Sequence, residues 1–290
     1  MKKINKHYLI RPLSLNPHRQ PYIDAKAAVM AAGGWFPGAS GLYRSAPILR
    51  MLKGIYNSKC AYCEQEPKGS PAQVEHFRPK DGVFGIVHTG YYWLAYEWSN
   101  LLLACGNCNS TKNNQFPIRN IPGRVLGPTL LAGVLDDRAN FILNSPLKNE
   151  GFELINPEID DPAKHIKFLP SGKIVDSNSP RGTLSIKVYG LNRDELWING
   201  RKKIVDDLLY KFGRRIDRYV SGERAAIVVI DDLKDIIEED IWRPISRNLS
   251  YSAFYKEMLL QYDQFLVAAI GNKRGATVLR IAFIKFIQSI

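Results

Sequence analysis

The feature of this sequence that most restricts its fold is a repeated cysteine spacing. Cys60 and Cys63 are separated by two residues, and Cys105 and Cys108 repeat that spacing. The 290-residue chain has no other cysteine. Each short gap allows a tight turn to direct two thiolates toward one tetrahedral Zn²⁺ ion. A disulfide framework is disfavoured because the chain is long and begins without an apolar export segment, and a thioredoxin-like site needs only one such pair. The spacing therefore predicts a structural zinc site.

The segment between the two cysteine pairs, residues 64–104, exceeds the roughly 15–20 residues of a simple zinc ribbon. It contains the dipeptide Glu75-His76 and, shortly before the second pair, Asn100. Asn109 follows the last cysteine directly, and Lys112 comes three residues later. The inserted segment and the residues just after the second pair therefore hold the side chains whose chemistry decides the interpretation.

These positions resemble the HNH endonuclease family, whose ββα-metal fold is a β-hairpin and a helix around one catalytic metal ion. In that family an acidic residue precedes the first histidine, here Glu75 before His76. The middle asparagine corresponds to Asn100, and the third position is Asn109. Asparagine at the third position is a common variant, and its carbonyl oxygen can still bind a hard cation. A lysine three residues further on, here Lys112, is also frequent in the family.

The chemistry of phosphodiester hydrolysis assigns a role to each residue. A neutral imidazole with a pKa near 6.5 can take a proton from water at cellular pH, so His76 is the predicted general base. Mg²⁺ or Mn²⁺ prefers oxygen ligands, which Glu75 and Asn109 provide. Asn100 completes the predicted catalytic set, although we expect it to hold the hairpin loop in shape. Because adjacent strand residues point to opposite faces, Glu75 and His76 can converge only where the backbone bulges or bends.

Three basic residues near these positions are candidates for contacts with substrate phosphate. Arg78, Lys80 and Lys112 could reach phosphate oxygens, and the alternative is ordinary solvated charge. The aromatic residues between 91 and 98 could stack on bases, but a role in the core of the module is favoured.

We predict an α+β chain that is mainly α-helical and encloses the zinc-stabilised nuclease module. Residues 1–57 are expected to form a basic N-terminal arm and short helices. Residues 58–120 form the HNH nuclease module with its four-cysteine zinc site, and residues 121–290 form a loop-rich and then helical region. The expected helices are Asp24–Ala32, Pro47–Tyr56, Asn192–Tyr219, Ser252–Ile270 and Ala276–Ile287, and a β-hairpin is expected around Pro170.

The charge of the chain indicates a polyanionic partner. The formal net charge is +12, and residues 1–59 hold ten basic residues against one acid. A second basic stripe, Lys211, Arg214, Arg215 and Arg218, could instead be a solubilising helix face. No apolar run approaches the roughly 18–20 residues of a membrane helix, so we expect a cytoplasmic protein without membrane contact.

A narrower resemblance extends beyond the HNH positions. Residues 93–105, 112–117, 154–157 and 189–193 are similar to the PtuB-like HNH subunits of Septu-type antiphage systems. Such subunits work beside an ABC-type ATPase (PtuA-like) and degrade DNA or cut tRNA. This chain has no Gly-x-x-x-x-Gly-Lys motif, so ATP would bind to the partner.

Three other functions stay open at this point. The same nuclease chemistry could be directed at RNA, such as tRNA, instead of DNA. The zinc site could stabilise a non-catalytic module that binds nucleic acid or protein. A third alternative is a homing or restriction-type nuclease that acts without an ATPase.

Overall fold

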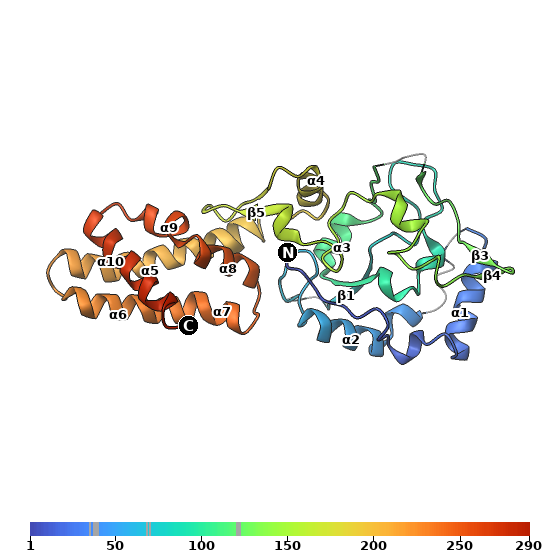
Figure 1. Ribbon diagram of the computed structural model, residues 1–290, viewed down its shortest axis with the longest axis horizontal. Helices are drawn as coiled ribbons and strands as arrows, with labels where there is room; N and C mark the ends of the chain where they lie inside the picture. The colour runs from blue at the N-terminus through green and yellow to red at the C-terminus, as the bar shows by residue number, and fades with distance from the viewer. Residues whose placement is uncertain (35, 37–40, 68, 70, 120–122) are drawn as a thin grey trace. The chain divides into compact units, whose positions relative to one another are not determined.

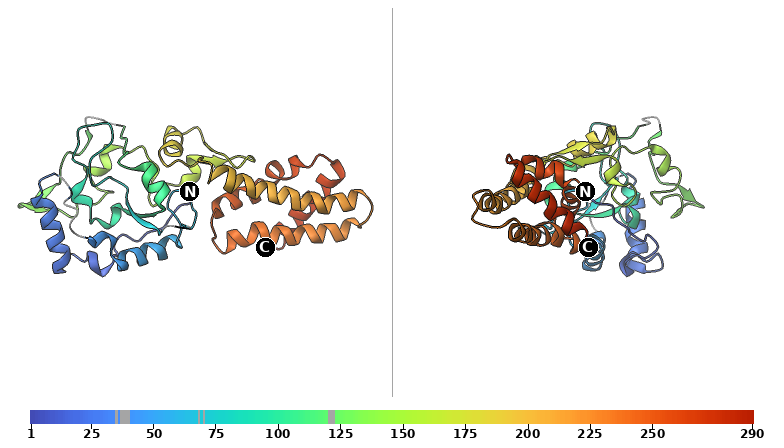
Figure 2. Two further views of the ribbon diagram at one scale, coloured as in Figure 1. Left: turned by 180° about the vertical axis from the view of Figure 1, so that it is seen from behind. Right: turned by 60° about the vertical axis from the view of Figure 1, so that its left-hand side comes forward.

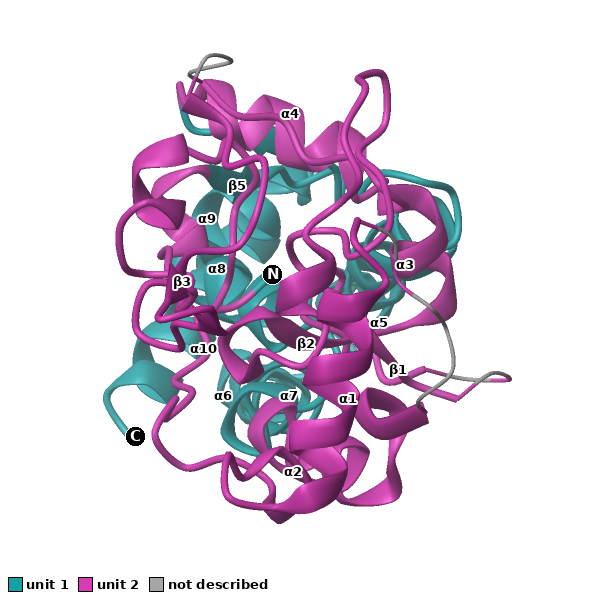
Figure 3. Ribbon diagram, turned by 90° about the vertical axis from the view of Figure 1, so that its right-hand side faces the viewer, with its two compact units in different colours: residues 1, 166–177, 191–290 teal, residues 2–165, 178–190 magenta. Residues whose placement is uncertain are grey.

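The computed structural model describes residues 1–34, 36, 41–67, 69, 71–119 and 123–290 (Figure 1). The chain divides into two compact units, coloured separately in Figure 3. Unit 2 comprises residues 2–165 and 178–190, and unit 1 comprises Met1 and residues 166–177 and 191–290. The fold is helix-rich with three small two-stranded sheets among the described residues, in agreement with the predicted mixture of helices and strands.

The domain boundaries expected from the sequence differ from this division. The boundary at residue 57 lies inside unit 2, because the helix that ends there packs against a central strand of the same unit. The boundary at residue 120 falls on residues 120–122, which are outside the described part of the chain.

Two helices open unit 2. Helix α1 (Gln20–Ala31) begins four residues earlier than expected, because Pro21 fits the first helical turn. It ends just before Gly33, whose φ of +64° favours glycine. Helix α2 (Ala46–Tyr56) matches the prediction and buries Ile48 and Leu52. Two short 3₁₀ turns accompany these helices, η1 (Leu13–Leu15) and η2 (Gly41–Arg44).

The centre of unit 2 is an antiparallel strand pair followed by a short helix. Strand β1 (Gln73–His76) pairs with β2 (Leu101–Ala104), so that His76 lies opposite Leu101. Helix α3 (Gly106–Lys112) begins two residues after β2. The connection between the strands contains η3 (Tyr92–Leu94) and η4 (Trp98–Asn100). The aromatic residues between 91 and 98 are buried, as the core alternative predicted.

The N-terminal arm packs into unit 2 through a buried lysine. Lys6 Nζ donates to the carbonyl oxygens of Trp98 (2.7 Å) and Leu101. The same ammonium lies 3.2 Å from the Glu158 carboxylate, and both side chains are shielded from solvent. Lys6 therefore anchors the arm beside the start of β2 and does not present its charge at the surface.

The rest of unit 2 is mostly irregular, as expected for residues 117–163. Its regular elements are the hairpin β3 (Leu130–Leu131) and β4 (Val134–Leu135), the turns η6 (Leu147–Glu150) and η7 (Pro162–Lys164), and helix α4 (Pro180–Val188). The start of α4 is capped by the Ser179 side chain, which accepts from the Gly182 N–H.

Unit 1 is a hairpin followed by a helical bundle. The predicted hairpin is confirmed as β5 (Ile166–Phe168) and β6 (Ile174–Asp176). The helical elements are η8 (Trp197–Lys202), α5 (Lys203–Val220), α6 (Ala226–Ile236), η9 (Ile237–Trp242), α7 (Arg243–Ser246), α8 (Ser252–Leu260), α9 (Tyr262–Phe265), η10 (Val267–Ala269) and α10 (Lys273–Ile287). Helices α5, α6 and α10 pack side by side around one apolar core (Figure 2).

Several details of unit 1 differ from the sequence prediction. Asn192 does not cap a helix, because its amide exchanges two hydrogen bonds with the backbone of Ile174 in β6. The predicted helix 252–270 is interrupted at Gln261, whose backbone (φ −119°, ψ 35°) is not helical. Helices α6 and α7 were not predicted.

The basic stripe on α5 is largely neutralised within unit 1. Lys211 lies 2.6 Å from the Asp240 carboxylate, and Arg215 lies 3.8 Å from that of Asp232. These contacts support the solubilising alternative for the stripe. Within the described residues, no helix combines the length and apolarity that crossing a bilayer requires.

Candidate active site

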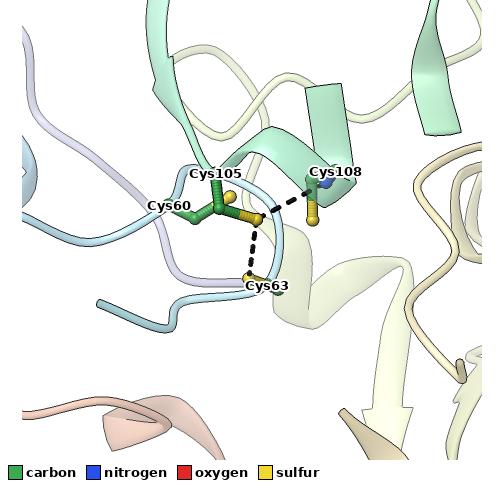
Figure 4. Close-up of side chains that lie close together, drawn as sticks. All are labelled: Cys60, Cys63, Cys105 and Cys108. Atoms are coloured by element: carbon green, nitrogen blue, oxygen red, sulfur yellow. Dashed lines mark hydrogen bonds between the residues drawn. The ribbon is translucent and has the colours of Figure 1, made fainter. Parts of the chain in front are cut away.

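The four cysteine sulfur atoms converge at one point in unit 2 (Figure 4). All four lie within 4.8 Å of one another, and the Cys63 and Cys105 sulfurs are 3.8 Å apart. A tetrahedron with Zn–S bonds of about 2.3 Å has edges of about 3.8 Å. The donor set and its spacing therefore fit a structural Zn²⁺ ion.

The cysteine cluster joins three elements of the central motif. The first pair lies in a turn that β2 holds, since the Ala61 N–H donates to the Leu103 carbonyl (2.8 Å). Cys105 follows β2 directly, and its sulfur caps α3 by accepting from the Cys108 N–H. Hydrogen bonds from Cys108 and the other thiols lower the pKa of Cys105. A metal ion at this position would fix β2 and α3 relative to each other.

A cavity of about 240 Å³ lies beside β1 and α3. Its walls include Glu75, His76 and Asn109 from the predicted site. Val74, Glu75 and His76 are consecutive residues of β1, and consecutive strand side chains point to opposite faces. Because all three nevertheless line the cavity, it lies along the edge of β1 that does not pair with β2. No bulge interrupts the pairing of β1, in which each residue has one partner on β2. The two side chains thus reach one cavity without a bulge, the first of the two irregularities, bulge or bend, that the sequence analysis named.

His76 is held by a backbone hydrogen bond. Its Nε2 lies 3.0 Å from the Ala95 carbonyl oxygen, which can only accept, so the proton is assigned to Nε2 and Nδ1 is left as the acceptor. The ring also meets Tyr43 edge-on, with 4.7 Å between centroids. Burial is the largest cause that lowers the pKa of His76 to about 3; the hydrogen bond to Ala95 opposes this shift, and the nearby charges of Lys80, Lys112 and Arg44 contribute to it. The imidazole is therefore neutral at cellular pH.

Glu75 is buried beside a lysine from α3. Lys112 Nζ lies 2.7 Å from Glu75 Oε1, and the Tyr62 hydroxyl donates to the same oxygen at 3.2 Å. Burial raises the pKa of Glu75, whereas Lys112 and Tyr62 oppose that rise. The backbone of His76 also hydrogen-bonds to this carboxylate, which lines the cavity and can act as an oxygen ligand there.

Asn109 lies on α3 and lines the same cavity. Its Nδ2 donates to Gln73 Oε1 at 2.7 Å, which assigns the amide nitrogen to that contact. Within the part of the chain that the structure describes, no group donates a hydrogen bond to the side-chain carbonyl oxygen of Asn109. Asn109 and Glu75 therefore each offer one hard oxygen to a cation.

Asn100 is fully buried and holds the backbone that follows β1. Its Oδ1 accepts from the Arg78 N–H (2.8 Å), and its Nδ2 donates to the Arg78 carbonyl (3.0 Å). Asn100 is not among the cavity-lining residues. This geometry favours the expected structural role over a contact with substrate.

Two of the three predicted phosphate-binding residues are enclosed in the protein. Arg78 is 0% exposed, and its guanidinium pairs with Glu150 (3.0 Å) and donates to the Leu147 carbonyl. Lys112 is also 0% exposed and donates to the His76 carbonyl (3.0 Å) in addition to its pairing with Glu75. The prediction of phosphate contacts by these two side chains is therefore corrected, because neither charge reaches solvent. Lys80 does line the cavity.

Comparison with known proteins places this site in a family. Residues 60–115 match the HNH endonuclease family, a segment that contains the cysteine cluster, Glu75, His76 and Asn109. The Septu protein PtuB of Bacillus mycoides (strain KBAB4) is 38% identical over 229 residues, which cover 76% of this chain and 70% of that protein. The chain belongs to the PtuB family. The PtuB of Bacillus thuringiensis is 27% identical over 150 residues, 51% of this chain and 42% of that protein.

The chain is also similar to part of a second Septu protein. PtuA of Bacillus mycoides (strain KBAB4) is 26% identical over 241 residues, which cover 78% of this chain but only 31% of that protein. The similarity is therefore confined to less than a third of PtuA.

The cavity of this PtuB-family chain is also lined by residues that the sequence analysis missed, among them an aromatic and a basic side chain from the N-terminal region. Tyr43 and Arg44 line it from η2, outside the segment 60–115 that matches the HNH endonuclease family. The one sequence signal that pointed toward them was the excess of basic residues before residue 60. That signal identified the segment but could not select Arg44 from the ten basic residues in it.

Proposed function

We propose that this protein is a metal-dependent HNH endonuclease that hydrolyses phosphodiester bonds of nucleic acid. The observation that carries the proposal is that His76, Glu75 and Asn109, all within the HNH-matching segment, line one cavity. The order β1, β2, α3 beside a four-cysteine cluster supports a zinc-stabilised ββα-metal module. In this proposal Cys60, Cys63, Cys105 and Cys108 hold structural Zn²⁺.

His76 acts as the general base. Its neutral Nδ1 takes a proton from the attacking water, while the Nε2–H donated to Ala95 keeps the ring in one orientation and one tautomer. Burial holds the pKa of His76 well below cellular pH, so the imidazole is neutral there and need not lose a proton before it acts.

Glu75 and Asn109 would hold Mg²⁺ or Mn²⁺ through one carboxylate oxygen and one amide oxygen. When bound, such an ion would neutralise negative charge on the phosphate and stabilise the departing oxygen. Lys112 sets the position of Glu75, and Gln73 sets that of Asn109. Asn100 positions the backbone between His76 and the cavity residue Lys80.

We further propose that the protein is the nuclease subunit of a Septu-type antiphage system. Its similarity to two PtuB proteins supports this role. The partner would be a PtuA-like ABC-type ATPase, since this chain contains no phosphate-binding loop of its own. DNA is the favoured substrate and RNA the alternative, and the expected location is the cytoplasm.

The proposal is tested with the full-length protein, alone and with its ATPase partner. Duplex DNA and a folded tRNA are incubated with Mn²⁺ or Mg²⁺, and with neither ion. His76→Asn should lose cleavage by roughly 10²–10⁴-fold at an unchanged melting temperature. His18→Asn, at an exposed site outside the cavity, is the matched control and should cleave normally.

The outcomes separate the alternatives. Cleavage of tRNA but not DNA would select the RNA-directed version. Equal activity of His76→Asn and the wild type would refute the assignment of the base. If the protein binds nucleic acid but shows no divalent-ion-dependent cleavage, with or without the partner, the remaining alternative is a non-catalytic, zinc-stabilised binding module.

A further inference from the structure

Two basic side chains lie over one aromatic ring at the wall of the candidate cavity. The Arg44 guanidinium carbon is 5.1 Å from the centroid of the Tyr43 ring, and Lys80 Nζ is 5.9 Å from the same centroid. Lys80 Nζ is also 4.4 Å from the centroid of Phe36. The buried Tyr43 ring in turn meets His76 edge-on. Both positive charges therefore lie beside the aromatic ring that also contacts the imidazole.

Neither positive charge has an acidic partner in contact with it. Among the residues that the structure describes, no carboxylate lies within 4.0 Å of the Arg44 guanidinium or of Lys80 Nζ. The nearby buried cations Lys112 and Arg78 each have such a partner. Burial lowers the pKa of Lys80; Asp81 raises it, and the like charge of Arg44 lowers it again. Two neighbouring cations that lack a contacting anion favour the binding of an external one.

We propose that Arg44 and Lys80 form a phosphate-binding subsite for the backbone of the nucleic-acid substrate. This inference rests on the proposed nuclease function and names the residues that would hold a phosphodiester in the cavity of His76. Arg44 is suited to the task because its planar guanidinium can donate two parallel hydrogen bonds to phosphate oxygens. Tyr43 serves as the platform that orients it.

The location of Arg44 has a consequence for the architecture of the site. Arg44 comes from η2, between α1 and α2, whereas His76 and Asn109 come from the HNH-matching segment. The substrate site would thus be completed by the N-terminal part of unit 2. This arrangement also replaces the phosphate contacts first expected from Arg78 and Lys112, which are enclosed.

The subsite is tested by the affinity of the full-length protein for nucleic acid in buffer without added divalent ions, so that cleavage does not interfere. The probes are a fluorescently labelled DNA duplex, a second duplex of unrelated sequence and a folded RNA. Arg44→Gln should weaken binding by roughly tenfold, equally for both duplexes, and should lower the slope of log K against log salt by about 0.9. Arg44→Lys should keep that slope. The melting temperature of each variant serves as a check on folding.

Arg50→Gln is the matched control, because Arg50 is exposed on α2 and does not line the cavity. It should leave both the affinity and the salt slope close to those of the wild type. Equal losses in Arg44→Gln and Arg50→Gln would indicate a diffuse basic surface and overturn the subsite. An unchanged salt slope in Arg44→Gln would also overturn it.

A separate measurement distinguishes failure of the subsite from failure of the proposed nuclease function. Cleavage by the wild-type protein is assayed with Mn²⁺ and the ATPase partner. If the wild type cleaves and Arg44→Gln binds normally, only the subsite is refuted. If the wild type does not cleave but Arg44→Gln shows the selective binding loss, the nuclease function fails and the phosphate-binding subsite stands.

Discussion

Lys112 and Glu75 form a buried ion pair, with 2.7 Å between Nζ and Oε1, that ties helix α3 to strand β1. The lysine also donates to the His76 carbonyl oxygen, so one ammonium contacts two consecutive residues of the strand. A buried pair of this kind contributes little net stability compared with apolar residues, but it is strongly destabilising to break. Lys112 therefore acts on the site by fixing the position of Glu75.

Replacing Lys112 with methionine should lower the free energy of unfolding by about 3–5 kcal/mol, because the Glu75 carboxylate would be left buried without its counter-charge. The double variant Glu75→Gln/Lys112→Met should recover part of that loss, since no charge remains to be desolvated. Urea unfolding of the wild type, both single variants and the double variant measures the coupling.

Lys53→Met is the control for this cycle, because Lys53 is an exposed lysine on α2 and its replacement should change stability by no more than about 0.5 kcal/mol. A loss in Lys112→Met no larger than that in Lys53→Met would contradict the importance of the buried pair.

Replacing Cys105 with serine should remove zinc and unfold unit 2, because structural zinc contributes on the order of 10 kcal/mol to folding. Most of the far-ultraviolet helical signal should persist, since α5, α6 and α10 share a core that lies in unit 1. Zinc content by mass spectrometry and circular dichroism together check both expectations. A stable, zinc-free Cys105→Ser variant with native near-ultraviolet dichroism would show that the cluster is not a structural metal site.

The parts of the site that depend on local spacing could be predicted from the sequence. The cysteine cluster follows from two short turns. Glu75, His76 and Asn109 were indicated by the resemblance to the HNH family, and the three residues line one cavity. Helix α2 was predictable because its apolar residues repeat at helical spacing.

The parts that depend on distant partners could not be predicted. The sequence around Arg78 gives no sign that its buried guanidinium pairs with Glu150, 72 residues later. In the same way, Asn192 carries a local capping signal, yet the nearby backbone of β6 takes its hydrogen bonds. Arg44 reaches the cavity only because η2 packs beside β1, a tertiary contact that no sequence period encodes.

Replacing Asn100 with alanine should destabilise the protein and reduce cleavage together. The variant would leave the buried Arg78 N–H without an acceptor, which costs about 1–3 kcal/mol. Asn107→Ala, at an exposed position on α3, is the control and should have little effect on either quantity. Chemical unfolding and initial cleavage rates, measured on the same preparations, decide the matter. Normal stability with abolished cleavage would instead indicate that Asn100 contacts the substrate.

The final prediction concerns how the buried His76 makes stability depend on pH. Its pKa is about 3 in the folded protein and near 6.5 in the unfolded chain. The folded-state pKa is low mainly because burial disfavours the charged form of the ring. Between these values the unfolded chain binds a proton that the folded protein does not. His76 therefore has no effect above pH 6.5, and it lowers the free energy of unfolding by up to about 1.4 kcal/mol for each pH unit below that. The loss ends near pH 3, where both states are protonated.

His76→Gln isolates this contribution, because glutamine does not titrate and its amide can still donate to the Ala95 carbonyl. Urea unfolding of both proteins is measured at pH 7.5 and pH 5.0 without added Mg²⁺ or Mn²⁺. Other titrating groups affect the two proteins alike, so only the change in their difference is interpreted. On acidification the wild type should lose about 2 kcal/mol more than His76→Gln. If the two proteins lose equal stability, the ring is protonated in the folded state at pH 5.0, and it would then not be the buried neutral base that the proposed mechanism requires.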